Sequence, residues 1–185
     1  MRSLWTFIDS KALAEREAIN AKAAHDYFNE LQIRQELTPI NTGGVLLMLG
    51  ESAFLQEAVP LLVEKAIPRG GSIGNFYFGG SDAKPQPRLK YADFGVLVLT
   101  DQRLIFEGCS ESRSLKYDEV ISVKASADTI EVSSSQSAKS DFYRVENPMI
   151  WSGLIDGMVS GRLMSFTKPA KSYSPGQRVA SFWED

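Results

Sequence analysis

The amino-acid sequence predicts an α+β fold that is mainly β, in which an antiparallel sheet packs against a helix. Residues 94–132 hold short runs of β-branched and aromatic residues separated by polar breaks, which is typical of strands joined by tight turns. The stretch is too short to contain crossover helices, so its strands must be antiparallel. Residues 149–164 repeat apolar side chains at helical spacing and predict the helix that covers the sheet.

The N-terminal part of the chain predicts one long helix. Ser10 is a suitable N-cap because its hydroxyl can accept an unpaired backbone N–H of the first turn. Pro39 stops the helix, so we expect it to span about residues 11–37. Its apolar stripe is thin, because the first half is mostly Ala, Glu and Lys. A helix of this composition is hard to maintain alone in water, so we expect it to lie on the sheet, on a partner chain or on a membrane surface.

The region between this helix and the main strands is less clearly patterned. Residues 52–67 are apolar, and their periodicity leaves both strand and helix open. Pro60 would cost about 3 kcal/mol inside a helix, and in a strand it requires an edge or a bulge. Residues 72–78 predict one strand, residues 79–87 a loop, and residues 88–91 a short strand that leads into the main hairpin.

The clearest element is a β-hairpin at residues 95–108, with a polar break of hairpin length at residues 100–102. Further short strands are predicted at residues 113–116, 120–125, 129–133 and 142–145. Asn147 caps the final helix, and Pro148 occupies the first helical position, where its missing N–H costs nothing.

The main hairpin also carries a family resemblance. Residues 95–108 have the sequence Gly-Val-Leu-Val-Leu-Thr-Asp-Gln-Arg-Leu-Ile-Phe-Glu-Gly, which resembles a hairpin of bacterial pleckstrin-homology-like (PH-like) and GRAM-like domains. Similar segments follow in the expected order at residues 114–123 and 128–132, and Gly50-Glu51 resembles the pair that opens the first strand of these domains. The resemblance implies an antiparallel barrel of about seven strands capped by one C-terminal helix, and it favours strand for residues 52–67.

These patterns divide the chain into three parts. We expect an N-terminal helical extension at residues 1–40, a PH-like barrel domain with its capping helix at residues 44–164, and a flexible tail at residues 165–185, which is rich in Lys, Ser and Pro. The sequence has one cysteine, no signal peptide and no stretch near the roughly 18 apolar residues of a membrane span. We therefore expect a cytoplasmic protein.

Composition and isolated residues argue against several functions. A net charge of −3 does not suit a nucleic-acid-binding protein, which normally has a basic excess. His25 is the only histidine, and a metal site needs three or four clustered ligands. Cys109 has no histidine near it in sequence to activate its thiol. The glycines of residues 70–74 lack the Lys-Ser/Thr ending of a phosphate loop. We predict no catalytic residue, no metal and no cofactor.

Basic residues form the first candidate site, because the resemblance implies it. In PH domains that bind phosphoinositides, basic residues in the loop between the first two strands hold the head-group phosphates through charge-assisted hydrogen bonds. The candidate anionic-ligand contacts in this chain are Lys65, Arg69, Arg88, Lys90 and Arg113. The alternative is a solvated charged loop. Arg103, which lies inside the hairpin motif, is predicted to be a structural pairing residue.

Aromatic residues outside the predicted barrel form the second candidate site. They could pack on their own domain or anchor another chain, since aromatic side chains are frequent interface hot spots. The candidate partner contacts are Trp5, Phe7, Tyr27, Phe28, Phe182 and Trp183. The sequence favours a non-catalytic interaction module that binds a protein partner or a second copy through the barrel and the N-terminal helix. The alternative is peripheral binding of phospholipid head groups.

Overall fold

The structure is a computed structural model that describes residues 10–67, 71–73, 76–78 and 86–167. Helix α1 (Ser10–Arg34) comes first in the chain, and helix α2 (Pro148–Val159) comes last. The strands are β1 (Ala53–Ile67), β2 (Gly71–Ile73), β3 (Phe76–Phe78), β4 (Gln86–Thr100), β5 (Arg103–Gly108), β6 (Ser112–Lys116), β7 (Val120–Ala125), β8 (Thr129–Ser134) and β9 (Asp141–Arg144), with a 3₁₀ helix η1 (Tyr117–Glu119) between β6 and β7. The predicted α+β, mainly β fold with an N-terminal and a C-terminal helix is confirmed.

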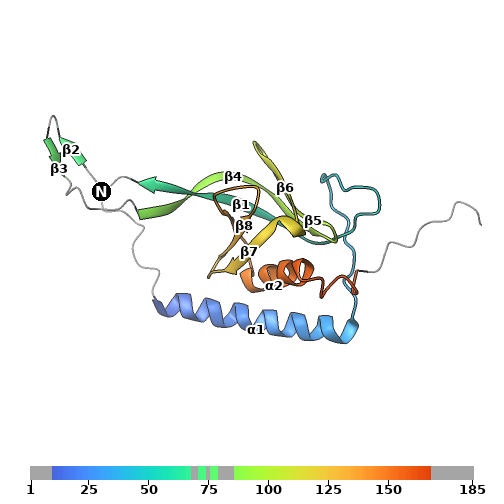
Figure 1. The fold of residues 1–185 in the computed structure, drawn as a ribbon. Coiled ribbons are helices and arrows are strands. Elements are labelled where there is room, and N and C mark those ends of the chain that lie inside the picture. Colours follow the sequence, from blue (N-terminus) through green and yellow to red (C-terminus); the bar gives the residue numbers. More distant parts are fainter. Residues whose placement is uncertain (1–9, 68–70, 74–75, 79–85, 168–185) are drawn as a thin grey trace, which may run out of the picture.

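Seven strands form one antiparallel sheet in the order β6-β5-β4-β1-β9-β8-β7, and β2 pairs only with β3. The central strand β1 pairs with β4 along its whole length but with β9 only at Leu61 and Leu62. Figure 1 shows α2 lying against one side of the curled sheet, with α1 running alongside α2. The part of the sheet formed by β4, β5 and β6 and the part formed by β7, β8 and β9 are therefore joined through β1.

The hairpin of β4 and β5 is buried on both faces. Leu97 belongs to the main core, together with Trp151 of α2, and each is at most 1% exposed. Val98 and Ile105 point to the other face and pack in a second cluster with Val45, which comes from the loop before β1. The alternating apolar side chains predicted for this hairpin are therefore confirmed, and the loop that covers the outer face explains why both alternating sets are apolar.

Helix α2 begins as its sequence predicts. The side-chain oxygen of Asn147 accepts two backbone N–H groups of the first turn at 3.1 and 3.2 Å, and Pro148 follows at the first position. Trp151 is buried, and its indole N–H donates to Glu57 of β1 at 2.7 Å. The helix ends at Val159, five residues before the predicted end at residue 164.

The region predicted at residues 52–67 is strand rather than helix, as the resemblance favoured, and β1 begins at Ala53. Pro60 is tolerated because it lies just outside the two residues that pair with β9 and next to the irregularity between Leu61 and Leu62. The single strand predicted for residues 72–78 is wrong, because β2 and β3 are two short strands that pair with each other. The short strand predicted at residues 88–91 is part of the longer β4.

The two halves of α1 have different surroundings. Residues 11–19 are all exposed, whereas Leu31 in the second half is buried in the main core. The ring of Phe28 lies so close to α2 that a Cβ on Gly153 would be 2.5 Å from it. The helix ends at Arg34 rather than residue 37 because Gln35 takes a φ of 49°. No helix in the described part of the chain is long and apolar enough to cross a membrane.

Candidate interaction surfaces

The loop between α1 and β1 contains no charged residue from position 37 to position 50. We call these residues the uncharged loop. Val45 is buried against the outer face of the β4–β5 hairpin, and Leu47 packs half-buried beside it. Ile40 forms an isolated antiparallel bridge to Ala53 at the start of β1. The loop is therefore fixed to the sheet at two places. Its lack of charge contrasts with the whole chain, in which charged residues make up 23%.

Three apolar side chains of this loop point away from the sheet, and we call Leu46, Met48 and Leu49 the apolar tip. Leu46 is 91% exposed and Leu49 is fully exposed. The tip is held by a turn in which the Glu51 N–H donates to the Met48 carbonyl at 3.0 Å. Gly50 has a φ of 82°, which the third position of such a turn requires. The tip is thus a hydrogen-bonded turn that presents leucine to solvent.

A buried ion pair supports the base of this turn. Arg103 binds both carboxylate oxygens of Glu51, through Nε and Nη2, each at 2.9 Å. The Met48 N–H also donates to Glu51 at 2.7 Å, and the Thr100 hydroxyl lies 2.8 Å from its other oxygen. Burial alone would raise the pKa of Glu51, but these hydrogen bonds outweigh burial, and the pKa lies below its ordinary value. The predicted pairing role of Arg103 is confirmed.

At the other end of β1, the sheet narrows to a two-stranded ribbon of residues 63–67 and 86–90, which extends away from the helices (Figure 1). Lys65 lies directly opposite Arg88, and Lys90 is two residues further along β4. Side chains two residues apart on a strand share a face, so these three cations form a basic face. All three are exposed, and none forms an ion pair with the described residues.

Among the described residues, one predicted anionic-ligand residue, Arg113, does not join this face. Arg113 is on β6, where it pairs with Asp141 and with Glu111 at 2.6 Å. Burial of Arg113 lowers its pKa, but the two ion pairs outweigh burial and leave the pKa above its ordinary value. The guanidinium is therefore engaged within the sheet. Arg69 lies outside the described residues. Of the four predicted residues that the structure describes, Lys65, Arg88 and Lys90 come together and Arg113 lies apart from them.

Two of the predicted partner contacts pack on their own chain. The Tyr27 and Phe28 rings meet edge to face with centroids 5.4 Å apart, and both pack half-buried against the main core. Their rings are therefore largely used inside this domain. The other four residues proposed as partner contacts, Trp5, Phe7, Phe182 and Trp183, lie outside the described residues.

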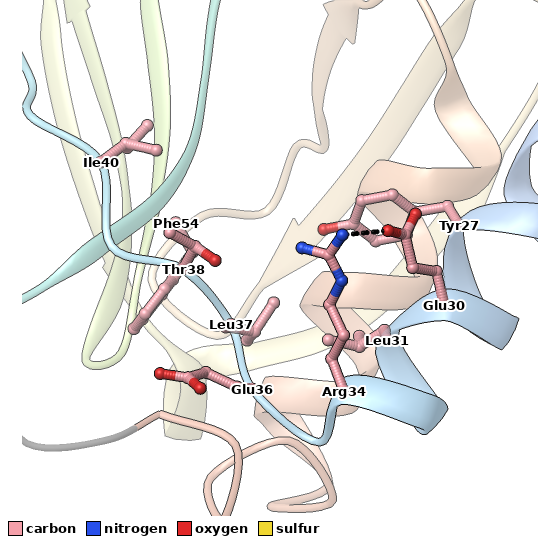
Figure 2. A pocket seen from close by; sticks show the side chains of 9 residues that line it. All are labelled: Tyr27, Glu30, Leu31, Arg34, Glu36, Leu37, Thr38, Ile40 and Phe54. Carbon is pink, nitrogen blue, oxygen red and sulfur yellow. Dashed lines mark ion pairs between the residues drawn. The ribbon is translucent and has the colours of Figure 1, made fainter.

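A small hollow of about 250 Å³ lies between α1, the uncharged loop and β1 (Figure 2). Arg34 and Glu30 form an ion pair across one turn of α1 at 2.5 Å, shown as a dashed line. Burial, together with Glu30, raises the pKa of Tyr27. The volume is below the range of about 300–1,000 Å³ that is usual for small-molecule sites. Arg34, the basic residue of the lining, is already paired with Glu30, so the hollow offers little to an anionic ligand.

A second hollow of about 380 Å³ lies between α1 and α2, and we call it the α1–α2 hollow. Its lining comprises Phe28, Leu31, Gln32, Gly153, Asp156, Gly157, Arg162, Leu163 and Phe166. A Cβ on Gly157 would lie 2.5 Å from the Leu163 side chain, so the glycine allows residue 163 to close one wall. The Phe166 carbonyl accepts the Leu37 N–H at 3.0 Å, which joins this wall to the start of the uncharged loop. Phe166 thus packs with the domain, although the sequence places it in the tail.

Within the described residues, no three His, Cys, Asp or Glu side chains are grouped to hold a metal ion. His25 is exposed on α1, and Cys109 is exposed in the turn after β5. The carboxylate of Asp93 is buried and accepts the backbone N–H groups of Ser110 at 2.8 Å and Glu111 at 2.9 Å, and these bonds lower its pKa. This arrangement organises the β5–β6 turn and involves no second carboxylate.

Comparisons with known proteins assign no family. No protein-family model matches the chain, and no curated protein matches its sequence. Among solved structures, the chain is similar to the crystal structure of the C-terminal domain of an unknown protein from Leishmania infantum, at 16% identity and a TM-score of 0.38. That match covers 60% of this chain and 87% of the other. A similarity at this level assigns neither a family nor a function.

The apolar tip is not among the residues that the sequence nominates. The sequence does contain a signal, because residues 37–50 are the longest run without a charged residue in the chain. What the sequence lacks is the distinction between Val45 and Leu47, which point inward, and Leu46, Met48 and Leu49, which point outward.

Proposed function

We propose that this chain is a non-catalytic interaction module that binds another protein surface through the apolar tip. The observation that carries the proposal is the exposure of two leucines: Leu49 is fully exposed within a hydrogen-bonded turn, and Leu46, which precedes that turn, is 91% exposed. Burying one such side chain is worth about 1.5–3 kcal/mol. A turn that is already ordered loses little conformational entropy on binding, so most of this free energy is available for affinity.

The fold is compatible with this role. The seven antiparallel strands and the terminal helix support a PH-like or GRAM-like barrel, which residues 95–108 resemble, although a fold alone does not determine a function. The exposed first half of α1 adds surface that a partner could contact, including Ile19, which is 68% exposed. The free thiol of Cys109 suits a cytoplasmic location.

Photo-crosslinking in cells tests the proposal. A benzophenone amino acid replaces Leu49 in the full chain, and the same replacement at Ile121, an exposed apolar residue of β7, is the matched control. We expect protein adducts from position 49 after irradiation and few from position 121. The same adduct yield from both positions, or no protein adduct from position 49, would overturn the proposal.

A second candidate function is peripheral binding of an anionic phospholipid surface, and the basic face favours it. Lys65 and Arg88 are like charges directly opposite each other, an arrangement that is unfavourable unless an anion is nearby. Clusters of Lys and Arg are attracted to anionic membranes by about 1 kcal/mol per charge near the surface. Three cations therefore support weak, salt-sensitive binding.

Co-sedimentation with vesicles containing phosphatidylserine tests this second candidate. The variant carries Lys65→Gln, Arg88→Gln and Lys90→Gln, and the control removes the same charge at the exposed residues Lys22, Lys116 and Lys139. We expect binding by the control to match the unmodified chain and binding by the ribbon variant to fall by about tenfold or more. Equal binding by both variants would remove the candidate.

A further inference from the structure

We infer that the protein partner of the apolar tip is a second copy of this chain, and that the two copies pair about a two-fold axis. In this dimer, the apolar tip of each copy enters the α1–α2 hollow of the other. The inference rests on the proposed function, because it names the partner of the same surface. Four features of the described residues support it.

The first feature is the balance of charge around the tip, which does not suit a lipid surface. The uncharged loop supplies no cation. The two arginines that line a hollow together with Leu46 are engaged internally, since Arg103 pairs with Glu51, and Arg113 pairs with Glu111 and Asp141. Binding to an anionic membrane needs cations that are free to face it. The basic face, whose three cations form no ion pair with the described residues, lies at the opposite end of β1.

The second feature is that a neutral surface can pair with itself. In a two-fold interface the same patch is used on both subunits, so a charged group near the axis meets its own copy and is repelled. The uncharged loop avoids this repulsion, and depletion of charge is typical of the centre of protein interfaces. The basic face, with three unpaired cations, would repel a second basic face.

The third feature is an apolar receptor on the same chain. The α1–α2 hollow, at about 380 Å³, is open to solvent and lined largely by apolar groups, among them Phe28, Leu31 and Leu163. Its two charged residues, Asp156 and Arg162, are paired with each other at 2.5 Å. The hollow therefore offers apolar contact without an unpaired charge, which is what an exposed leucine requires.

The fourth feature is position. The Leu37 N–H donates to the Phe166 carbonyl, so the uncharged loop begins at the wall of the hollow. In Figure 1 the loop rises from the C-terminal end of α1, at the same end of the molecule as the end of α2. Because the tip and the hollow lie at the same end of the molecule, each copy can insert its tip into the hollow of the other copy while its own hollow is filled. Such a reciprocal contact closes as a dimer and does not propagate into a filament.

Sedimentation velocity of the full chain over a wide range of concentration tests the inference. We expect the unmodified chain to form a dimer, and Leu49→Asp to weaken dimerisation by about a hundredfold or more, because two leucines are lost per dimer. The control Ile121→Asp introduces the same charge at another exposed apolar residue and should leave dimerisation unchanged. Both side chains are exposed, so we expect both variants to fold, and circular dichroism of each variant checks this.

Charge exchange between positions 49 and 32 tests the seating of the tip in the hollow. Leu49→Lys alone should be monomeric, because two lysines would enter apolar hollows. Gln32→Glu places a carboxylate in the lining of the hollow, and its heterodimer with Leu49→Lys should be at least tenfold tighter than the heterodimer that Leu49→Lys forms with the unmodified chain. If mixing gives no gain in affinity, the claim that the tip lies in the α1–α2 hollow is overturned.

The outcomes separate this inference from the proposed function. A monomer at all concentrations, with crosslinks from position 49 to a different protein, overturns the second copy as partner and leaves the interaction module intact. A dimer that Leu49→Asp does not weaken also overturns the inference, because its interface lies elsewhere. Binding to uncharged phosphatidylcholine vesicles that Leu49→Asp abolishes would overturn it in favour of a lipid surface.

Discussion

The two ends of β1 are built in contrasting ways. At its start, the chain forms a tight turn, and the buried Glu51–Arg103 pair ties that turn to the β4–β5 hairpin. At its far end, residues 63–67 pair with β4, and Lys65 on this strand and Arg88 and Lys90 on β4 form no ion pair with the described residues. The first end is charge-neutral and apolar at its surface, and the second is basic. The strand therefore leads to one uncharged surface that can pack against a second copy of the chain and to one basic surface that would repel the same surface of a second copy.

This difference indicates that the start of β1 contributes to the stability of the fold and that its far end is available for electrostatic recognition. A buried, fully hydrogen-bonded carboxylate is costly to disturb, so the first end should be rigid and essential for folding. A two-stranded ribbon that pairs on one edge only contributes little to stability, so its residues are available for electrostatic recognition. The following predictions test that contrast, beginning with the largest effect.

Removing the buried carboxylate should have the largest effect. Glu51→Ala leaves the Arg103 guanidinium buried without its partner, and we expect a loss of about 3–5 kcal/mol in the free energy of unfolding. Glu64→Ala at the exposed far end of β1 is the control and should change it by less than about 0.5 kcal/mol. Urea unfolding followed by circular dichroism measures both. Equal losses would contradict the contrast between the two ends.

Two glycines compare the paired sheet next to β1 with the uncharged loop that precedes β1. Gly95 lies opposite Gly108, and a Cβ there would be 2.2 Å from the Glu107 carbonyl oxygen. Gly95→Ala should therefore destabilise the fold by about 1–3 kcal/mol. Gly43→Ala in the uncharged loop meets no atom within 4 Å and should be nearly neutral. Thermal unfolding measures both variants, and a melting temperature that Gly43→Ala lowers more than Gly95→Ala does would contradict this explanation.

The dependence of stability on pH should come from the first end. Because the pKa of Glu51 is lowered from 4.5 on folding, its stabilising effect is complete above about pH 4.5 and is lost as the pH falls through the folded pKa. Each unit of pKa difference is worth about 1.4 kcal/mol. Glu51→Gln should weaken the fall in stability below pH 4.5 without abolishing it, since the lowered pKa of Asp93 acts in the same direction. An unchanged acid profile would contradict this assignment.

The smallest effect is expected at the ribbon. Lys65→Thr removes one of two like charges that face each other across the strands, so we expect the free energy of unfolding to change by no more than about 0.5 kcal/mol, with a slight gain at low salt. Melting temperatures at low and high salt measure the effect. A large loss at both salt concentrations would mean that the ribbon is structurally essential.

The sequence predicted the elements that rest on local pattern. The alternation around residues 95–108 and the Asn147-Pro148 start of α2 depend on neighbouring residues, and both are confirmed. The run at residues 72–78 was predicted as one strand, because its apolar alternation is the same in one strand and in two that fold back on each other.

The candidate sites were harder to predict because they depend on pairing between distant strands. The register that places Lys65 opposite Arg88 spans more than twenty residues of intervening chain, so sequence spacing alone could not separate these residues from Arg113. Likewise, nothing local in Val45 to Leu49 tells which side chains meet Val98 and Ile105 and which remain exposed. Charge content was the useful signal for this loop, because it does not depend on register.

The central claim is that the apolar tip of one copy lies in the α1–α2 hollow of another, and a mixed-chain disulfide tests it most directly. One chain carries Leu49→Cys and the other Gln32→Cys, each with Cys109→Ser to remove the native thiol. A disulfide needs the two Cα atoms within about 4.4–6.8 Å of each other. After mild oxidation of the mixture, we predict a covalent dimer in which position 49 is linked to position 32, and no link when Ile121→Cys replaces Leu49→Cys. Equal linkage from positions 49 and 121, or no covalent dimer at all, would contradict the claim.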